Sequence, residues 1–267
     1  MTKEKGFNVD PSWRGVYKAS GLCLFAGGVI VFIFILSLFI MRQPLPVPAK
    51  EALENPVTPT LLFLLAALGE FLLMPGVLGL YLSLKDVKKN HILIATAVWL
   101  AAVSMFLVSR GQIISLSQIS GRYMATTSET LKAAYLASAD LAIEVANVYA
   151  DMALMLLGVA SIIVGLVMLK GVFGKRIGYL VILAGTLTLF GTFGILLEPL
   201  AILAPLGLVL GAVWQIVIGA KLYKLGKDVQ HASHRTMRPV DVVSGESLDT
   251  GRVGLLVLPP SVPRTFP

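Results

Sequence analysis

The sequence predicts an all-α polytopic membrane protein, a bundle of six transmembrane helices with both termini in the cytoplasm. Hydrophobic residues make up 56% of the 267-residue chain and charged residues only 14%, against about 45–50% and 25% in soluble domains. Six apolar runs follow one another along the chain, each long enough to cross most of a bilayer. Lysine and arginine gather in the segments that six crossings would put on one side.

The charge distribution also sets the orientation. Of the 22 lysines and arginines, four precede or begin the first run, three lie in the second loop, three in the fourth loop and seven follow the sixth run. The positive-inside rule assigns the side with these segments to the cytoplasm. The net charge of +7 is then explained by topology, so we expect a cell-membrane address and the lipid bilayer as partner, and no nucleic acid.

Each predicted span is an apolar run bounded by charge, proline or glycine. The first run is longer than the 7–15 apolar residues of a signal peptide, so it is expected to stay in the chain. The expected spans are 19–41, 59–84, 91–112, 145–169, 177–197 and 200–221.

The remaining segments lie outside these spans. Residues 1–18 form a basic cytoplasmic tail before a transmembrane domain at 19–225. Residues 42–58 contain four prolines, which disfavour a helix and predict an extended loop. Residues 226–267 are polar and rich in Ser, Arg, Asp and Pro, a composition typical of a disordered tail. A helix over 129–169 would be about 60 Å long, so it must protrude, bend or break.

Glu70 is the most informative single residue, because it is the one charge in the second span. An acidic side chain near the middle of a bilayer costs about 2.5–3.5 kcal/mol, so it should face the bundle and be either protonated or paired. Pro75 and Gly76 follow it and predict a helix break. One interpretation is a proton or ion site next to a broken helix. The other is a structural glutamate that is hydrogen-bonded to a neighbouring helix.

Arg110 closes the third span and is expected near the outer interface. Counting along the helices puts Asp151 and Glu144 of the fourth helix at a similar level. The first hypothesis is an ion pair between Arg110 and one of these acids. The alternative is that Arg110 extends to the lipid headgroups while the acids face water.

Acidic and amide side chains share one face of the fourth helix. Asp140, Glu144, Asn147 and Asp151 are spaced four, three and four residues apart, and Glu198 is expected on the same side of the membrane. They could form an outer acidic vestibule for a cation, or simply cover the wet face of a protruding helix. Their spacing matches no metal-binding loop.

Several motifs are absent from the sequence. It has no HExxH, Walker or Gly-x-Ser-x-Gly motif, and Cys23 is its only cysteine. We therefore expect no metal, no cofactor, no disulfide and no catalytic residues.

Short motifs in the first, second and fourth spans resemble a family of bacterial and archaeal six-span membrane proteins that is known as a domain of unknown function. The resemblance covers about residues 14–225. It is carried by Tyr17-Lys18-Ala19-Ser20-Gly21-Leu22, Leu68-Gly69-Glu70-Phe71, Tyr81-Leu82 and Ala150-Asp151. It implies a six-span architecture in the cell membrane and assigns no activity.

Two classes of function fit these observations. One is a non-enzymatic carrier or channel-like protein for a small solute or proton, with Glu70 as its ionisable group. The alternative is a structural or accessory subunit that binds a membrane-protein partner or a second copy of itself. An intramembrane enzyme comes third, because no nucleophile and base occur in suitable positions.

Overall fold

The described part of the chain is built of helices. The computed structural model describes residues 11–41, 48–171, 173–195, 197–200 and 202–236, and every regular element in these ranges is helical. The α-helices are α1 (Arg14–Met41), α2 (Ala49–Glu54), α3 (Val57–Ala125), α4 (Glu129–Met168), α5 (Lys175–Thr192) and α6 (Leu203–Thr236). Short 3-10 turns occupy Pro11–Trp13, Phe193–Ile195 and Glu198–Leu200. The predicted all-α class is confirmed.

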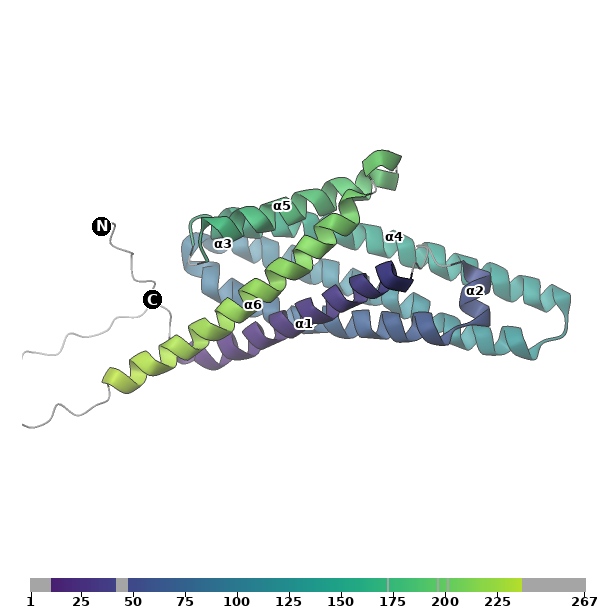
Figure 1. Ribbon diagram of the computed structural model, residues 1–267, viewed down its shortest axis with the longest axis horizontal. Coiled ribbons are helices and arrows are strands. Elements are labelled where there is room, and N and C mark those ends of the chain that lie inside the picture. Colours follow the sequence, from purple (N-terminus) through teal and green to yellow (C-terminus); the bar gives the residue numbers. More distant parts are fainter. Residues whose placement is uncertain (1–10, 42–47, 172, 196, 201, 237–267) are drawn as a thin grey trace, which may run out of the picture.

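The long helix α3 consists of two arms that meet at Lys88. It spans 69 residues, and Lys88 has φ −153° and ψ 80°, outside the helical region. The chain reverses at this point, and the two arms run in opposite directions (Figure 1). The predicted spans 59–84 and 91–112 are therefore the two arms of α3, and the basic segment between them forms the bend.

α1, the two arms of α3, α4, α5 and α6 run along the length of the molecule (Figure 1). Four of the described helices are long and apolar enough to cross a membrane, namely α1, α3, α4 and α6. α5 has 18 residues and is not among these four. α4 is a continuous helix of 40 residues, about 60 Å long at 1.5 Å per residue. It therefore exceeds the roughly 30 Å hydrocarbon core without breaking.

Glycines allow the helices to approach closely. On α5, a Cβ at Gly185 would lie 2.7 Å from the carbonyl oxygen of Gly158 on α4, and a Cβ at Gly158 would lie 2.9 Å from the carbonyl oxygen of Gly185. Gly21 of α1 and Gly219 of α6 face each other's backbone in the same way. Close backbone contact increases van der Waals packing, which holds helices together where lipid is the solvent.

Two clusters of buried apolar side chains lie along the bundle. The larger one includes Trp99 and Trp214, whose rings meet edge to face with centroids 5.1 Å apart. The smaller one includes Phe34 and Phe63 and the buried side of α2. α2 packs against α3 and α4, and the hydroxyl of Ser120 donates a hydrogen bond to the carbonyl of Leu53.

Three expectations from the sequence need correction. The loop predicted at 42–58 contains α2, because three of its side chains (Ala49, Ala52 and Leu53) are buried against the long helices. The disordered tail predicted from residue 226 is wrong for residues 226–236, because α6 stays helical to Thr236. Residues 237–267 lie outside the described residues.

The third correction concerns the predicted break at Pro75 and Gly76. α3 remains helical through both residues, and its non-helical backbone is at Lys88. The small residues in this stretch serve packing instead. A Cβ at Gly76 would lie 2.9 Å from the Cβ of Leu24 on α1, so the absence of a side chain lets α3 and α1 touch.

Candidate functional site

Glu70 and Arg110 form a buried ion pair between the two arms of α3. The guanidinium of Arg110 donates two hydrogen bonds to Oε1 of Glu70, from Nε at 3.1 Å and from an Nη at 2.8 Å. The side chains are only 8% and 13% exposed. Of the two states expected for Glu70, protonated or paired, the structure has the paired one. The bend at Lys88 makes this possible, because it returns the second arm alongside the first.

Three phenylalanine rings surround the guanidinium of Arg110. Its central carbon lies 5.3 Å from the ring centroids of Phe34, Phe63 and Phe106. Phe34 and Phe63 also meet edge to face, with centroids 5.6 Å apart. Aromatic faces attract a desolvated cation, so the rings hold Arg110 in place in addition to the carboxylate.

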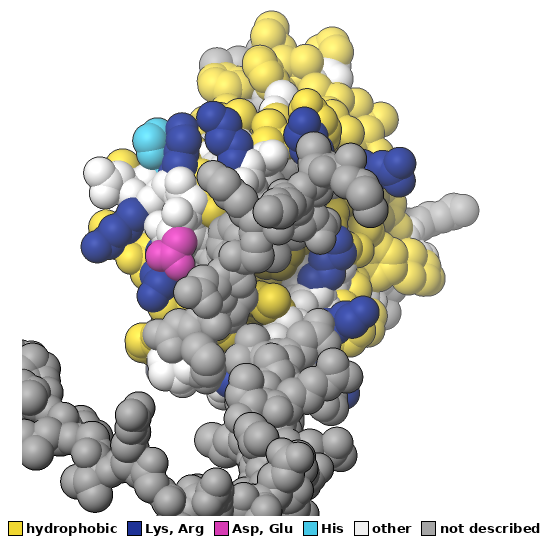
Figure 2. Space-filling model, turned by 90° about the vertical axis from the view of Figure 1, so that its left-hand side faces the viewer, with side chains coloured by type: hydrophobic (Ala, Val, Ile, Leu, Met, Phe, Trp, Pro, Cys, Tyr) yellow, Lys and Arg dark blue, Asp and Glu magenta, His cyan; other side chains and the backbone are white. Residues whose placement is uncertain are grey.

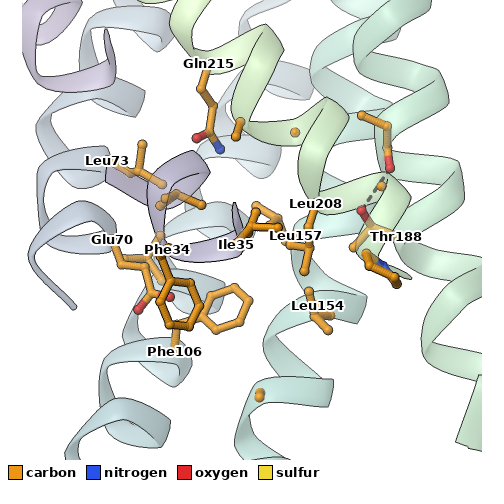
Figure 3. Close-up of a pocket in the computed structure, with 18 of the residues that line it drawn as sticks. Phe34, Ile35, Glu70, Leu73, Phe106, Leu154, Leu157, Thr188, Leu208 and Gln215 are labelled. Carbon is orange, nitrogen blue, oxygen red and sulfur yellow. Dashed lines mark hydrogen bonds between the residues drawn. The ribbon is translucent and has the colours of Figure 1, made fainter. Parts of the chain in front are cut away.

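A cavity of about 410 Å³ opens beside this pair, in the interior of the bundle (Figure 3). α1, α3, α4, α5 and α6 all contribute to its wall. Most of the lining is apolar, and ligand pockets of this size and character are typical of small-molecule sites. Representative apolar lining residues are Phe34, Ile35, Leu73, Phe106, Leu154, Leu157 and Leu208.

Three of the residues that line the cavity each have one buried polar atom without a protein partner. The atoms are Oε2 of Glu70, Nε1 of Trp99 and Oε1 of Gln215. Among the described residues these are all the buried side-chain nitrogen and oxygen atoms that lack a hydrogen bond. Leaving such a group unpaired costs about 1–3 kcal/mol. All three atoms belong to residues of the cavity wall, but each atom is itself buried, so the surface that the cavity offers is mostly apolar.

The wall of the cavity is incomplete between α1 and α6. The two helices touch at Gly28, where a Cβ would lie 3.0 Å from Cγ1 of Ile216. They diverge toward the end at which α6 meets α5 (Figure 1). In this diverging part, Phe39 lines the cavity and is 61% exposed, and a Cβ at Gly211 would have no heavy atom within 4 Å. The cavity is thus accessible from the apolar flank of the bundle.

Arg110 has a different partner from the one that the sequence suggested. The expected acids were Asp151 and Glu144, but among the described residues the ion pair of Arg110 is with Glu70. Glu144 is exposed and Asp151 is half-buried on α4. The physical reason is register. Glu70 and Arg110 lie at nearly the same height on the antiparallel arms of α3, and both face the interior.

The outer acidic vestibule receives no support from the arrangement. Asp140 is exposed, Asn147 is half-buried, and neither belongs to the cavity wall. Within the described residues, no group of three or more His, Cys, Asp or Glu could hold a metal ion. Glu198 lies in the 3-10 turn between α5 and α6, and its side chain is outside the described part.

Sequence reasoning missed the aromatic residues around Arg110 and the role of Gln215. Gln215 lines the cavity, and its Oε1 is buried without a hydrogen-bond partner. Gly207 packs closely on Thr188 of α5, whereas Gly211, four residues later on α6, opens to the cavity. One feature of the sequence could have indicated that Glu70 and Arg110 pair. Glu70 and Arg110 are nearly equidistant from the basic turn, which in a helical hairpin places them side by side.

Comparison with known proteins gives one match. The family described as "Domain of unknown function (DUF4386)" matches residues 20–222, which include both arms of α3 and the whole cavity wall. No curated protein and no solved structure matches the chain. The resemblance noted in the sequence is thereby confirmed at the level of a domain of unknown function, and the chain belongs to the DUF4386 family.

Proposed function

We propose that this protein is a non-enzymatic intramembrane carrier that binds a small, largely apolar molecule in the cavity beside Glu70. The observation that carries the proposal is the cavity itself. It is lined mostly by apolar side chains from five helices. A bundle with a purely structural role would fill such a space, because an unfilled cavity destabilises a fold.

The opening between α1 and α6 supports a molecule that is dissolved in the membrane. The exposed ring of Phe39 and the open face of Gly211 lie where the two helices diverge. An apolar molecule in the bilayer would reach the cavity there without crossing a polar surface. A proton alone fits less well, because Oε1 of Glu70 is already held by Arg110 in a buried pair.

The proposed topology has six crossings with both ends in the cytoplasm. α1, the two arms of α3, α4, α5 and α6 each make one crossing. Figure 2 supports this topology, because the end of the molecule at which α1 begins and α6 ends shows many Lys and Arg side chains and very few acids. Exposed basic residues of the bend, the α4–α5 turn and α6 include Lys88, Lys89, Lys170, Lys175, Arg176, Lys221, Lys224 and Lys227. A cytoplasmic face is typically basic in this way.

A second candidate function is an accessory subunit that binds a protein partner through the far end of the α3–α4 hairpin. Apolar side chains there are exposed, among them Met124 at 65% and Leu141 at 66%. α4 is about twice as long as the hydrocarbon core is thick, so this end would stand outside the membrane. A carrier requires a molecule in the cavity, whereas an accessory subunit does not, so occupancy of the cavity distinguishes the two candidate functions.

The test of the carrier proposal is to extract and identify small molecules that copurify with the protein. Three proteins are purified identically: the wild type, Gly211→Leu and Gly111→Leu. Leucine at 211 would project into the cavity, whereas Gly111 is exposed on α3 with no heavy atom within 4 Å of an added Cβ. We expect an apolar molecule at near-equal molar ratio with the wild type and Gly111→Leu and its loss from Gly211→Leu. Identical extracts from all three proteins would contradict the proposal.

A further inference from the structure

The cavity lies in the half of the bundle that is remote from its basic end. On α1, which begins at Arg14, the lining residues fall within 31–39. On α6, which runs in the opposite direction and continues to Thr236, they fall within 205–215. In the proposed topology this half of the bundle lies in the outer leaflet of the membrane.

Toward the basic end the cavity is closed by packed side chains. Trp99 and Trp214 line the cavity and are fully buried, and their rings meet edge to face there. Beyond them the larger apolar cluster continues to Leu222, which is also fully buried. α1 and α6 touch on this side, since a Cβ at Gly21 would lie 2.5 Å from the backbone nitrogen of Tyr223. These contacts close the cavity toward the inner leaflet.

Helix α2 covers the end of the cavity that faces the outer solution. Phe34 and Phe63 line the cavity and also belong to the smaller apolar cluster, together with Ala52 and Leu53 of α2. Both of these α2 side chains are fully buried, and α2 lies beyond the end of α1 (Figure 1). The opening between α1 and α6 is therefore the route to the cavity, and it faces the side of the bundle, where lipid is the solvent.

The chemistry of this space fits a hydrocarbon chain. Its lining is mostly apolar, and Figure 3 shows Ile35, Leu154 and Leu208 around it. The charged residues of its wall, Glu70 and Arg110, neutralise each other. A chain that fills the cavity supplies the van der Waals contacts that its lining otherwise lacks. A charged head group would lose its hydration inside without gaining partners, which is costly, so it stays outside.

We propose that the cavity holds one acyl chain of a phospholipid of the outer leaflet, which enters sideways between α1 and α6 while its head group remains at the membrane surface. Phe39 lies close to the end of α1 at Met41, so the opening is near the level of the outer head groups. From there the cavity extends inward to Trp214, which is the direction in which the chains of an outer-leaflet lipid run. The chains of an inner-leaflet lipid point at the closed side. This inference rests on the proposed function and names its ligand.

The test delivers a photoactivatable phospholipid to one leaflet at a time. The double variant Cys23→Ser/Lys89→Cys is reconstituted in both orientations into phosphatidylcholine vesicles. Phosphatidylcholine with a diazirine in its acyl chain is then exchanged into the external leaflet of these vesicles. An impermeant biotin maleimide marks the molecules whose basic end, where residue 89 is exposed, faces outward. After irradiation and solubilisation, capture on streptavidin separates the two orientations, and mass spectrometry maps the labelled residues of each pool.

The two pools should differ in the cavity. In the uncaptured pool the probe lies in the leaflet at the opening, and we expect labelling of Leu154 and Leu208 as well as of the exposed Ile40. In the captured pool the probe lies in the leaflet at the basic end, and it should label the exposed Leu22 but not the cavity. Adding Gly211→Leu should remove the cavity labelling and leave that of Ile40. The comparison of the pools uses one protein, so it remains decisive if Gly211→Leu does not fold.

The outcomes separate this inference from the proposed function. Equal cavity labelling in both pools, labelling from the basic end alone, or labelling that persists in Gly211→Leu overturns the inference. If the phospholipid labels Ile40 but not the cavity, a small apolar aryl diazirine takes its place. Cavity labelling by that probe shows that the cavity takes up a smaller apolar molecule, so the inference is overturned and the carrier stands. If neither probe labels the cavity, both fail.

Discussion

Oε1 of Glu70 accepts two hydrogen bonds from Arg110, forty residues later on the same helix. Glu70 lies 18 residues before the bend at Lys88 and Arg110 lies 22 residues after it. At 1.5 Å per residue these are about 27 and 33 Å along the two arms. The difference is about one helical turn, which the long arginine side chain spans. The pair therefore joins the two arms of α3 at one height and sets one side of the cavity.

Breaking this pair should destabilise the protein more than removing both partners. Glu70→Gln and Arg110→Gln each leave a buried charge without a counter-charge, so each should lower the free energy of unfolding by about 3–5 kcal/mol. The double variant restores neutrality, so its loss should be smaller than the loss in either single variant. Equilibrium unfolding in detergent micelles measures all three values. Strictly additive losses would show that the two side chains do not interact.

The aromatic rings around Arg110 should contribute separately. Phe63→Leu removes one ring from the guanidinium and one from the contact with Phe34, so we expect a loss of about 1–2 kcal/mol. Phe71→Leu is the matched control, because Phe71 is 59% exposed on the same arm of α3. It should change the free energy of unfolding by less than about 0.5 kcal/mol. Equal effects of the two substitutions would contradict a specific role for the rings.

The α4–α5 contact should tolerate no side chain at its glycines. Gly185→Ala would press a methyl group against the carbonyl of Gly158, and overpacking of this kind costs about 1–3 kcal/mol. Gly111→Ala lies in open space on a helix and should instead stabilise by up to about 1 kcal/mol. Thermal unfolding of the two variants side by side gives the comparison. A neutral Gly185→Ala would mean that α4 and α5 are further apart than described.

The proposed topology can be checked with single cysteines. In a Cys23→Ser background, Lys89→Cys and Lys175→Cys lie at the basic end, and Thr127→Cys lies at the turn between α3 and α4. A membrane-impermeant maleimide should label Thr127→Cys in intact cells. It should label the other two only after the membrane is opened. Labelling of Lys89→Cys and Thr127→Cys from the same side would rule out two crossings by α3.

The sequence predicted well the features that depend on the composition and length of its apolar runs. Apolar runs located every long helix, and the length expected for a helix over 129–169 agrees with the 40 continuous residues of α4. Proline content misled at 42–58, because burial of Ala52 and Leu53 stabilises α2 in spite of the flanking prolines. At Pro75, neighbouring helices hold α3 in its helical path despite the missing hydrogen-bond donor.

Predicting the site requires knowing which residues of neighbouring helices lie at the same height, and this alignment cannot be read from the sequence. Glu70 was identified as a buried acid because a charge in a span is conspicuous by itself. Its partner was misassigned, because the height of Arg110 was counted from the start of its own span and not from the bend at Lys88. The cavity could not be predicted at all. It is the space that five helices leave unfilled, and residues such as Gln215 and Gly211 acquire their roles only from that space.

The most direct measurement is photolabelling with a small apolar aryl diazirine, followed by mapping of the labelled residues by mass spectrometry. The label dissolves in the bilayer and should mark lipid-facing side chains such as Leu64 and Leu166, which are exposed. If the cavity takes up membrane-dissolved molecules, Leu154 and Leu208 of its wall should also be labelled in the wild type. In Gly211→Leu that labelling should disappear, while Leu64 and Leu166 remain labelled. Cavity residues that stay unlabelled in the wild type, or that are labelled equally in both proteins, would contradict an accessible intramembrane binding site.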